Sequence, residues 1–360
     1  MLIINIYNKG DYVRNTKETV CSFKSLYNAM TKCRKGVMWK DSVARYSNNG
    51  LVNILKLCNS LENNTYKIDD YQIFTIYEPK QREIVSTKFK DRVFQRSLCD
   101  NYLYDVMTKT FIYDNCACQT GKGTTFAMNR LNCHMQRFFR KHGLDGYVLR
   151  CDIKDYFGST PHKTAKAAVR EGVDDEWVLS HTDKIIDSFN HGSDPDVGMG
   201  LGSQITQLTQ LAVLNKLDYF IKEQLRIKQY IRYMDDFLLI HHDKNYLRYC
   251  LEEIKNFIEP LGIKLNIKKT QIFPLKQGIN FLGFKFKLTE TGKVIRLLSK
   301  ENIKRRKRKL RKYKKLVDEG KMTKEKADEC YASWKAHAKK GNSYKLLQRM
   351  DIYYESLWKE

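Results

Sequence analysis

The apolar positions of the chain follow two spacings, and each predicts one kind of element. Between residues 71 and 86, the stretch YQIFTIYEPKQREIVS alternates apolar and polar side chains around a polar break, which predicts two short strands joined by a loop. Between residues 202 and 225, apolar side chains recur every three or four positions, which predicts one long helix. The residues that define this spacing are Ile205, Leu208, Leu211, Leu214, Leu217, Ile221 and Leu225.

A second apolar run, YIRYMDDFLLI at 230–240, is interrupted by two adjacent acids, Asp235 and Asp236. The aromatic, aliphatic and β-branched flanks predict two strands, so Met-Asp-Asp should form the turn of a hairpin. Two neighbouring carboxylates repel each other unless a cation lies between them. Taken alone, these residues could form an ordinary turn exposed to water. The neighbouring elements must therefore show whether the two acids belong to a binding site.

A third acid is expected beside this pair. Residues 145–157, DGYVLRCDIKDYF, begin as a short apolar strand that ends at Asp152. The order of strands and helices around the acids predicts an α+β fold with a split-βαβ sheet, whose adjacent central strands bring Asp152, Asp235 and Asp236 together. Three converging carboxylates suit two divalent cations, which activate a 3′-hydroxyl and stabilise departing pyrophosphate.

The spacing of apolar residues also predicts elements in the rest of the chain. Residues 1–62 are expected to be helical, and so is nearly everything after residue 298. An amphipathic helix is expected near 243–259, and β-like pieces over 262–273 and 279–288.

The chain carries a large excess of positive charge. Its 360 residues include 65 Lys and Arg against 41 Asp and Glu, a formal net charge of +24. A fold does not need this excess, which favours a polyanionic partner such as nucleic acid. No run of 18 apolar residues occurs and the N-terminus lacks the apolar core of a signal peptide, so we expect no membrane association and a cytoplasmic location. The ten cysteines include no CxxC pair, which favours reduced thiols over a zinc site or a disulfide framework.

Several ordered motifs resemble those of bacterial reverse transcriptases of the retron and group II intron type. The resemblance implies a protein encoded by a bacterium or a phage. The resemblance covers roughly residues 70–358 and rests on DIKDYFGS at 152–159, YMDD at 233–236, LGIKLNIKKT at 261–270, FLGF at 281–284, and the segment 91–124 that ends in CQTGKGT. It implies a right-hand polymerase with fingers, a split-βαβ palm and a helical thumb. The expected divisions are an N-terminal helical extension at 1–62, fingers at 63–145, a palm at 146–288 and a basic thumb at 289–360, with no RNase H, integrase or endonuclease domain.

The resemblance also implies a catalytic centre. Asp152, Asp235 and Asp236 would hold two Mg²⁺ ions, with Mn²⁺ able to substitute. Lys269 would be the general acid that protonates pyrophosphate, and the adjacent Lys268 is the alternative.

Two further residues match positions that bind the incoming nucleotide. Arg82 matches the fingers arginine that holds the triphosphate, because a guanidinium fork suits phosphate oxygens. Lys80, Lys88 and a merely solvated arginine are its alternatives. Phe157 matches the aromatic residue that packs under the sugar and excludes a ribose 2′-hydroxyl, and plain core packing is its alternative.

The remaining substrate-binding positions lie in two motifs. Tyr233 belongs to YMDD. In GMGLGSQITQ at 198–207, Gly202 would let the backbone approach a nucleotide or template, since it has no Cβ. Gln207 would touch the templating base or the minor groove, although a helix-surface glutamine would look the same.

The subfamily remains open between two roles. The form of the 198–207 motif is similar to reverse transcriptases of diversity-generating retroelements, which make mutagenic cDNA. Leu201 stands where the commoner pattern has Gln, and Gly200 where the retroelement pattern has Pro. A phage-defence enzyme working with a structured noncoding RNA is the alternative. A template-independent terminal transferase and a non-catalytic RNA-binding protein on the same fold are the further rivals.

Residues 304–315, KRRKRKLRKYKK, contain ten Lys or Arg in twelve positions. Like charges at helical spacing destabilise a helix unless a partner neutralises them, and the phosphates of a nucleic acid would do so. Lys304, Arg305, Arg308 and Lys312 are therefore expected to bind nucleic acid. The expected partners are an RNA template, a nucleic-acid primer and dNTPs, with a structured noncoding RNA and a small basic accessory protein as further candidates.

Overall fold

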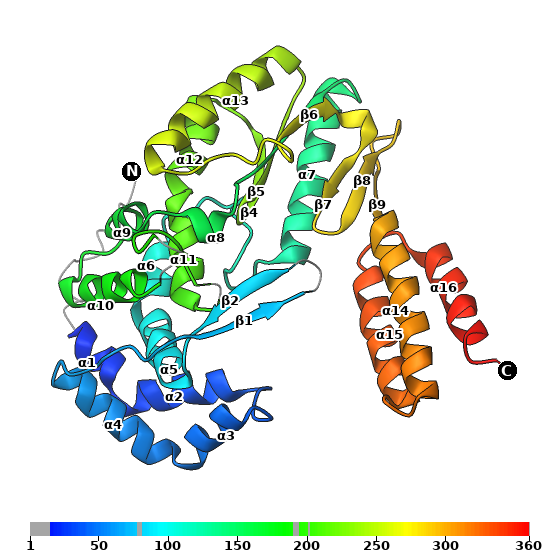
Figure 1. The fold of residues 1–360 in the computed structure, drawn as a ribbon. Coiled ribbons are helices and arrows are strands. Elements are labelled where there is room, and N and C mark those ends of the chain that lie inside the picture. The colour runs from blue at the N-terminus through cyan, green and yellow to red at the C-terminus, as the bar shows by residue number, and fades with distance from the viewer. Residues whose placement is uncertain (1–14, 78–80, 190–193, 201, 360) are drawn as a thin grey trace, which may run out of the picture. The chain divides into compact units, whose positions relative to one another are not determined.

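The computed structural model describes residues 15–77, 81–189, 194–200 and 202–359, and it has the expected α+β composition (Figure 1). The chain forms two compact units that interleave along the sequence. The first lies within Met1–Cys118, Ile153–Phe220 and Ile254–Leu265, and the second within Gln119–Asp152, Ile221–Glu253 and Asn266–Glu360. No described helix is long and apolar enough to cross a membrane.

The first unit begins with four helices, as the sequence predicts for this region from residue 15 onward. They are α1 (Thr16–Cys21), α2 (Phe23–Arg34), α3 (Asp41–Asn48) and α4 (Gly50–Glu62). The Ser22 hydroxyl accepts a hydrogen bond from the backbone N–H of Ser25 and so caps α2. Residues 1–14 lie outside the described part of the chain.

The expected pair of strands follows. β1 (Gln72–Ile76) and β2 (Arg82–Ser86) are antiparallel, with Gln72 opposite Ser86 and Ile76 opposite Arg82. Most of the connecting loop, residues 78–80 with Lys80, lies outside the described residues. The chain then continues through α5 (Phe89–Leu98), the π-helical turn η2 (Cys99–Leu103) and α6 (Tyr104–Thr108).

The rest of the first unit is helical, and it corrects one prediction. Its helices are α8 (Tyr156–Ser159), α9 (His162–Arg170), α10 (Glu176–Asp187), α11 (Gln204–Val213) and α12 (Asn215–Tyr219). The single helix expected over 202–225 is broken at Leu214, whose φ and ψ are −96° and 6°, and the π-helical turn η3 (Phe220–Gln224) follows α12. Leu214 is fully buried despite the break, so the apolar spacing records burial and does not reveal the interruption.

The second unit contains a four-stranded sheet that carries the acidic motifs. β3 (Tyr147–Asp152), β4 (Gln229–Tyr233), β5 (Asp236–His241) and β6 (Gln271–Pro274) are arranged in the order β4-β5-β3-β6 and are antiparallel throughout. The helix α7 (Thr124–His142) packs on β4 and β5, and α13 (Lys244–Ile258) follows β5. Of the β-like piece expected over 262–273, only Gln271–Pro274 forms a strand, because the preceding residues turn back toward the end of β3.

A second sheet and three helices complete this unit. β7 (Ile279–Phe281), β8 (Phe284–Leu288) and β9 (Val294–Leu298) form an antiparallel sheet, of which β9 was not expected. The helices α14 (Lys300–Asp318), α15 (Lys324–Ala338) and α16 (Tyr344–Ser356) follow (Figure 1). Thr323 caps α15 by accepting from the Lys326 N–H, as its position before the helix predicts.

Candidate active site

The predicted catalytic acids meet because of the register between β3 and β5. Asp152, the last residue of β3, lies opposite Asp236, the first residue of β5. Tyr233 closes the ladder between β4 and β5 opposite Asp236, which leaves Met234 and Asp235 as a two-residue turn. Asp236 therefore belongs to the strand and not to the turn where the sequence pattern placed it. The structure thus brings Asp152, Tyr233, Asp235 and Asp236 to one edge of the sheet.

The turn is held in an uncommon backbone conformation. Met234 has φ of 55°, in the left-handed region that tight hairpin turns use but that residues with a Cβ seldom adopt. Arg232, one of the largest fully buried side chains, donates an Nη1 hydrogen bond of 3.1 Å to the Met234 carbonyl oxygen. The buried Arg232 guanidinium thus stabilises the turn through this hydrogen bond, which the sequence pattern did not reveal.

Lys269 contacts the first catalytic acid. Its Nζ lies 2.7 Å from both carboxylate oxygens of Asp152, which is 5% exposed. The backbone N–H of Asn266 donates to the Asp152 carbonyl oxygen at 2.7 Å, and the Lys269 N–H donates to the Asn266 carbonyl at 3.0 Å. This turn carries Lys269 to the end of β3.

Arg150 contacts the third acid, a contact that the sequence analysis missed. Its Nε donates to Oδ1 of Asp236 at 3.1 Å and its Nη2 to Oδ2 at 2.7 Å. Burial raises the pKa of the Asp236 carboxyl, Arg150 opposes that rise, and the charges of Asp152 and Asp235 add to it. The signal was present in the sequence, because Arg150 lies two residues before Asp152 and so on the same face of the strand.

The donor set has the chemistry of a magnesium site. Carboxylate oxygens are the ligands that this hard cation prefers. Among the residues that the structure describes, however, no three His, Cys, Asp or Glu side chains are grouped closely enough to hold a metal ion. Lys269 forms an ion pair with Asp152, and Arg150 forms one with Asp236. The donor types therefore suit divalent cations, whereas the described arrangement places a basic side chain against Asp152 and another against Asp236.

A comparison with known protein families identifies the family of this chain. The reverse transcriptase (RNA-dependent DNA polymerase) family matches residues 77–286, more than half of the chain. The chain belongs to this family. The predicted reverse transcriptase family is thereby confirmed, and this family implies catalysis by divalent metal ions.

Similar solved structures are telomerases from two yeasts. The apo telomerase from Candida tropicalis truncated from its C-terminal domain is 13% identical, with a TM-score of 0.49, and the match covers 69% of this chain. Telomerase from Candida albicans in complex with a TWJ fragment of telomeric RNA is 10% identical, with a TM-score of 0.48, over 71% of this chain and 52% of that one. The chain spans 60% of the length of the first relative. No curated protein sequence matches the chain.

The expected nucleotide-binding residues Arg82 and Phe157 lie in the first unit. Arg82 begins β2, and its side chain is outside the described part of the structure. Phe157 lies in α8 and is half-buried, with its ring at a T-shaped 73° and 6.0 Å from that of Tyr156. Tyr156 is the buried member of this pair, and its hydroxyl donates to the Gln210 carbonyl oxygen at 2.5 Å. Core packing therefore needs Tyr156 more than Phe157.

Gly202 and Gln207 line a cavity of about 380 Å³ within the first unit. An added Cβ on Gly202 would meet the Val85 carbonyl oxygen at 3.7 Å, an ordinary contact, so packing within this unit does not require a glycine there. The other lining residues are Cys33, Arg92, Gln95, Arg96, Cys118, Gln204 and Leu208.

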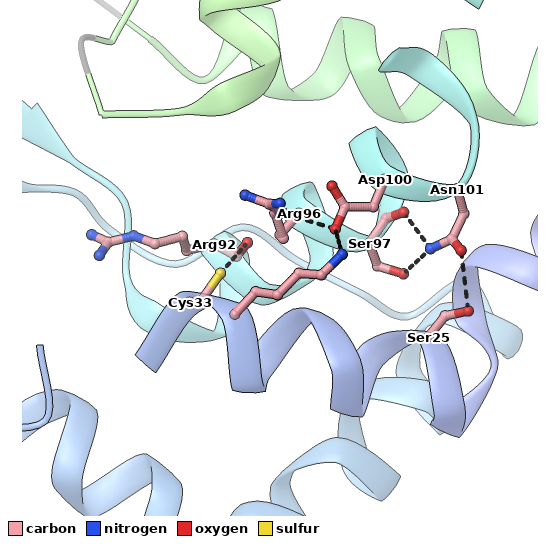
Figure 2. A network of polar contacts seen from close by, with 8 residues as sticks. Ser25, Cys33, Arg92, Arg96, Ser97, Asp100 and Asn101 are labelled. Atoms are coloured by element: carbon pink, nitrogen blue, oxygen red, sulfur yellow. Dashed lines mark hydrogen bonds and ion pairs between the residues drawn. The ribbon is translucent and has the colours of Figure 1, made fainter. Parts of the chain in front are cut away.

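The polar groups around this cavity are only partly satisfied. Gln95 is 1% exposed, yet neither atom of its side-chain amide has a hydrogen-bond partner among the described residues. Arg92 donates from Nη2 to the Ser86 hydroxyl and the Thr87 carbonyl, while its buried Nε has no partner within the described part of the chain. Arg96, by contrast, donates to Asp100 at 2.8 Å (Figure 2). Because a buried polar group without a partner costs about 1–3 kcal/mol, this cavity suits a polar occupant.

The basic residues predicted to bind nucleic acid all lie on α14. Lys304, Arg305, Arg308 and Lys312 are exposed, as the prediction requires. Arg306 and Lys307 instead lie over the rings of Trp334 and Tyr353, at 5.7 and 4.6 Å from the ring centroids. The helix thus has one face that packs through cation–π contacts and one that presents charge to solvent.

Proposed function

We propose that this protein is an RNA-directed DNA polymerase that extends a 3′-hydroxyl with dNTPs on an RNA template, using two Mg²⁺ ions. The observation that carries the proposal is the convergence of Asp152, Asp235 and Lys269 at one sheet edge in a chain of the reverse transcriptase family. Divalent ions bound there would activate the 3′-hydroxyl and stabilise the departing pyrophosphate.

Lys269 serves this reaction as a proton donor. Its side chain is 46% exposed although its Nζ contacts Asp152, so it is both accessible and anchored. A lysine ammonium at that position favours the pyrophosphate oxygens electrostatically and supplies a proton as they become basic. Without metal, the same ammonium keeps the buried Asp152 carboxylate neutralised.

The proposed substrate-binding residues are distributed over both units. In the first unit, Phe157 is proposed to exclude a ribose 2′-hydroxyl and Arg82 to hold the triphosphate. In the second unit, Tyr233 of the YMDD turn is a further proposed substrate-binding residue. The unsatisfied amide of Gln95 and the guanidinium of Arg92, in the cavity lined by Gly202 and Gln207, suit the base edges and phosphates of a template strand.

The basic face of α14 belongs to a thumb that follows the template–primer duplex through its phosphates. The right-hand division into an N-terminal extension, fingers, palm and thumb, with the limits given above, is part of this proposal. So is a cytoplasmic location. The small basic accessory protein is a further proposed partner.

Mutagenic cDNA synthesis in a diversity-generating retroelement is the biological role we favour, on the form of the 198–207 motif. The alternative is a defence enzyme that works with a structured noncoding RNA, and the strongly basic α14 would serve either role. Sequencing the cDNA made from RNA templates of known composition separates them in part, since frequent errors opposite one template base favour the retroelement role.

Primer extension tests the activity itself. We expect a labelled primer annealed to RNA to be extended by dNTPs in the presence of Mg²⁺, and not to be extended without a template. Template-free addition would favour the terminal transferase. Tight RNA binding without any incorporation would favour the non-catalytic RNA-binding protein.

A further inference from the structure

Residues 196–200, which we call the strap, run alongside the segment that carries Phe157 in the first unit. The backbone N–H of Met199 donates to the Phe157 carbonyl oxygen at 2.7 Å. One residue earlier, the N–H of Gly198 donates to the Thr160 carbonyl oxygen at 3.0 Å. Gly198 and Met199 are buried, so water does not compete for these two bonds. The position of the Phe157 backbone therefore depends on the position of the strap.

The same segment is held separately by α11. Gln210 is fully buried, and its Nε2 donates to the Tyr156 carbonyl oxygen at 3.2 Å and to the Thr160 hydroxyl at 3.0 Å. In return, the Tyr156 hydroxyl donates to the Gln210 carbonyl oxygen at 2.5 Å. These bonds fix the residues on either side of Phe157, whereas the bond to Phe157 itself comes from the strap.

His162, the first residue of α9, holds the strap in place. Its side chain is buried, and Nε2 lies 2.9 Å from the Gly198 carbonyl oxygen. Because a carbonyl oxygen can only accept, Nε2 carries the hydrogen and donates it. The backbone N–H of His162 also donates to the Asp196 carbonyl oxygen at 2.8 Å. The helix α9 packs on α11, so the strap is tied to the helical part of the first unit (Figure 1).

The other ring nitrogen of His162 shows that the residue is not simply a packing group. Nδ1 is buried without a hydrogen-bond partner among the described residues. Oδ1 of Asp187 lies 3.5 Å away, and Lys166 pairs with the same carboxylate, at 2.6 Å from Oδ2. A buried nitrogen without a partner destabilises a fold, and an apolar side chain of similar size would avoid this. The bond from Nε2 to Gly198 therefore accounts for a histidine at this position.

We propose that His162 is a positioning residue for the choice between deoxyribose and ribose. By holding the Gly198 carbonyl it fixes the strap, and the strap fixes Phe157 through the Met199 N–H. A residue that selects by shape has to be held within about 0.5 Å of its working position. Without the His162 bond, Phe157 gains freedom and space opens for a ribose 2′-hydroxyl. The inference rests on the proposed polymerase function and deepens it.

The ratio of kcat/KM for a matched rNTP to that for the dNTP, on a primed RNA template, tests this role. His162→Leu keeps the bulk but has no N–H, and it should raise the ratio by at least about tenfold. His162→Gln, whose amide can donate to the Gly198 carbonyl in place of Nε2, should keep the ratio within about threefold of the original. An unchanged ratio in His162→Leu, with DNA synthesis retained, would overturn the inference alone. If the unmodified protein adds no dNTP, the proposed function fails and the inference fails with it.

His181→Leu is the matched control. His181 is a second buried histidine of the first unit, and its Nδ1 is bonded within α10, 2.8 Å from the Trp177 carbonyl oxygen. Its loss should leave the ratio unchanged, although it also removes a buried imidazole. A rise as large as that in His162→Leu would mean that sugar choice responds to any loosening of this unit, which contradicts a specific role of His162.

A double-variant cycle asks whether His162 acts through Phe157. In a Phe157→Val protein, adding His162→Leu should change the ratio little further, because the side chain that the strap positions is already reduced. Effects that multiply in full would mean that the two residues act independently, and would contradict the inference. Circular dichroism checks folding. If His162→Leu does not fold, His162→Met replaces it, because the flexible thioether fills the same space without an N–H.

Discussion

At the scale of single residues, the catalytic centre depends on charges that neutralise one another before any metal arrives. Asp152 is 5% exposed and would be costly to bury alone, and Lys269 lies 2.7 Å from both its oxygens. The same lysine is the proposed proton donor. One side chain therefore neutralises Asp152 and is also proposed to take part in the reaction.

Lys269→Ala should lower the rate of nucleotide incorporation by about 10²- to 10⁴-fold, the usual contribution of a positioned general acid. The measurement is single-turnover addition of one dNTP at saturating template. Lys268→Ala is the matched control, because Lys268 is adjacent and exposed, and it should retain nearly the full rate. Equal losses in both variants would remove Lys269 from the proposed role.

Phe157→Val should raise incorporation of rNTPs relative to dNTPs. The phenylalanine is half-buried beside the buried Tyr156, so a smaller side chain opens space for a 2′-hydroxyl without emptying the core. The ratio of kcat/KM for matched rNTP and dNTP gives the answer. If DNA synthesis persists with an unchanged ratio, Phe157 has a packing role only.

The acidic residues could be predicted from their order and spacing along the sequence. The register between β3 and β5 confirms that Asp152 and Asp236 lie opposite each other. For Arg150 the one signal was its position two residues before Asp152, and Arg232 could not be predicted in a chain with 65 basic residues, because charge alone does not reveal a partner. Only the strand register and burial distinguish these two arginines from the many that face water.

At the scale of elements, α14 illustrates how one helix can be both packed and highly charged. Leu310 is fully buried, whereas Ile303, Tyr313 and Val317 are only half-buried. Arg306 and Lys307 cover aromatic rings of α15 and α16. Packing of α14 thus relies on cation–π contacts, which apolar spacing cannot reveal.

Replacing Lys304, Arg305, Arg308 and Lys312 by Gln should weaken RNA binding and flatten its salt dependence. The slope of log K against log salt should fall by about 0.7–0.9 for each phosphate that the variant no longer neutralises. The measurement is fluorescence anisotropy with labelled RNA at several salt concentrations.

The matched control replaces four lysines of the same region that already pair with carboxylates: Lys315, Lys321, Lys324 and Lys326. Three carboxylates, those of Glu319, Asp328 and Glu329, offset most of their charge, so the salt slope should change much less. A slope as steep in the α14 variant as in the unmodified protein would mean that this face does not bind nucleic acid.

The helix α10 should make stability depend on pH. His181 is buried against Phe94 and Trp177, and this burial lowers the pKa of its imidazole below that in the unfolded chain. The folded protein then binds fewer protons than the unfolded one, so the free energy of unfolding should fall as pH drops through about 6.5.

Urea unfolding at pH 7.5 and 5.5 measures this dependence. His181→Gln should reduce the difference between the two pH values, since glutamine does not titrate. The residual dependence would come from His241 and His337, whose pKa values burial also lowers. An unchanged difference in the variant would mean that His181 is not the group responsible.

The elements themselves were predictable where burial follows a simple period. Strands β3, β4 and β5 and helix α13 lie close to their expected ranges. The break at Leu214 was not predictable, because a buried apolar side chain on each side of it preserves the helical spacing. Strand β9 was missed because its residues are mostly half-buried and do not alternate.

At the scale of the whole molecule, the net charge of +24 and the family agree on a nucleic-acid partner. The two compact units interleave, so neither corresponds to one continuous segment, and the expected division into fingers, palm and thumb stays a prediction. The metal ligands proposed here all belong to one unit, which means that the catalytic acids are positioned by a single sheet.

The most direct test of the account is addition of single nucleotides to a labelled DNA primer on RNA templates that differ only in the first unpaired base, with Mg²⁺ present. The unmodified protein should add the complementary dNTP to each template, and Asp235→Asn should add none while keeping its circular dichroism spectrum. Addition that ignores the template base, or that persists in Asp235→Asn, would contradict the account.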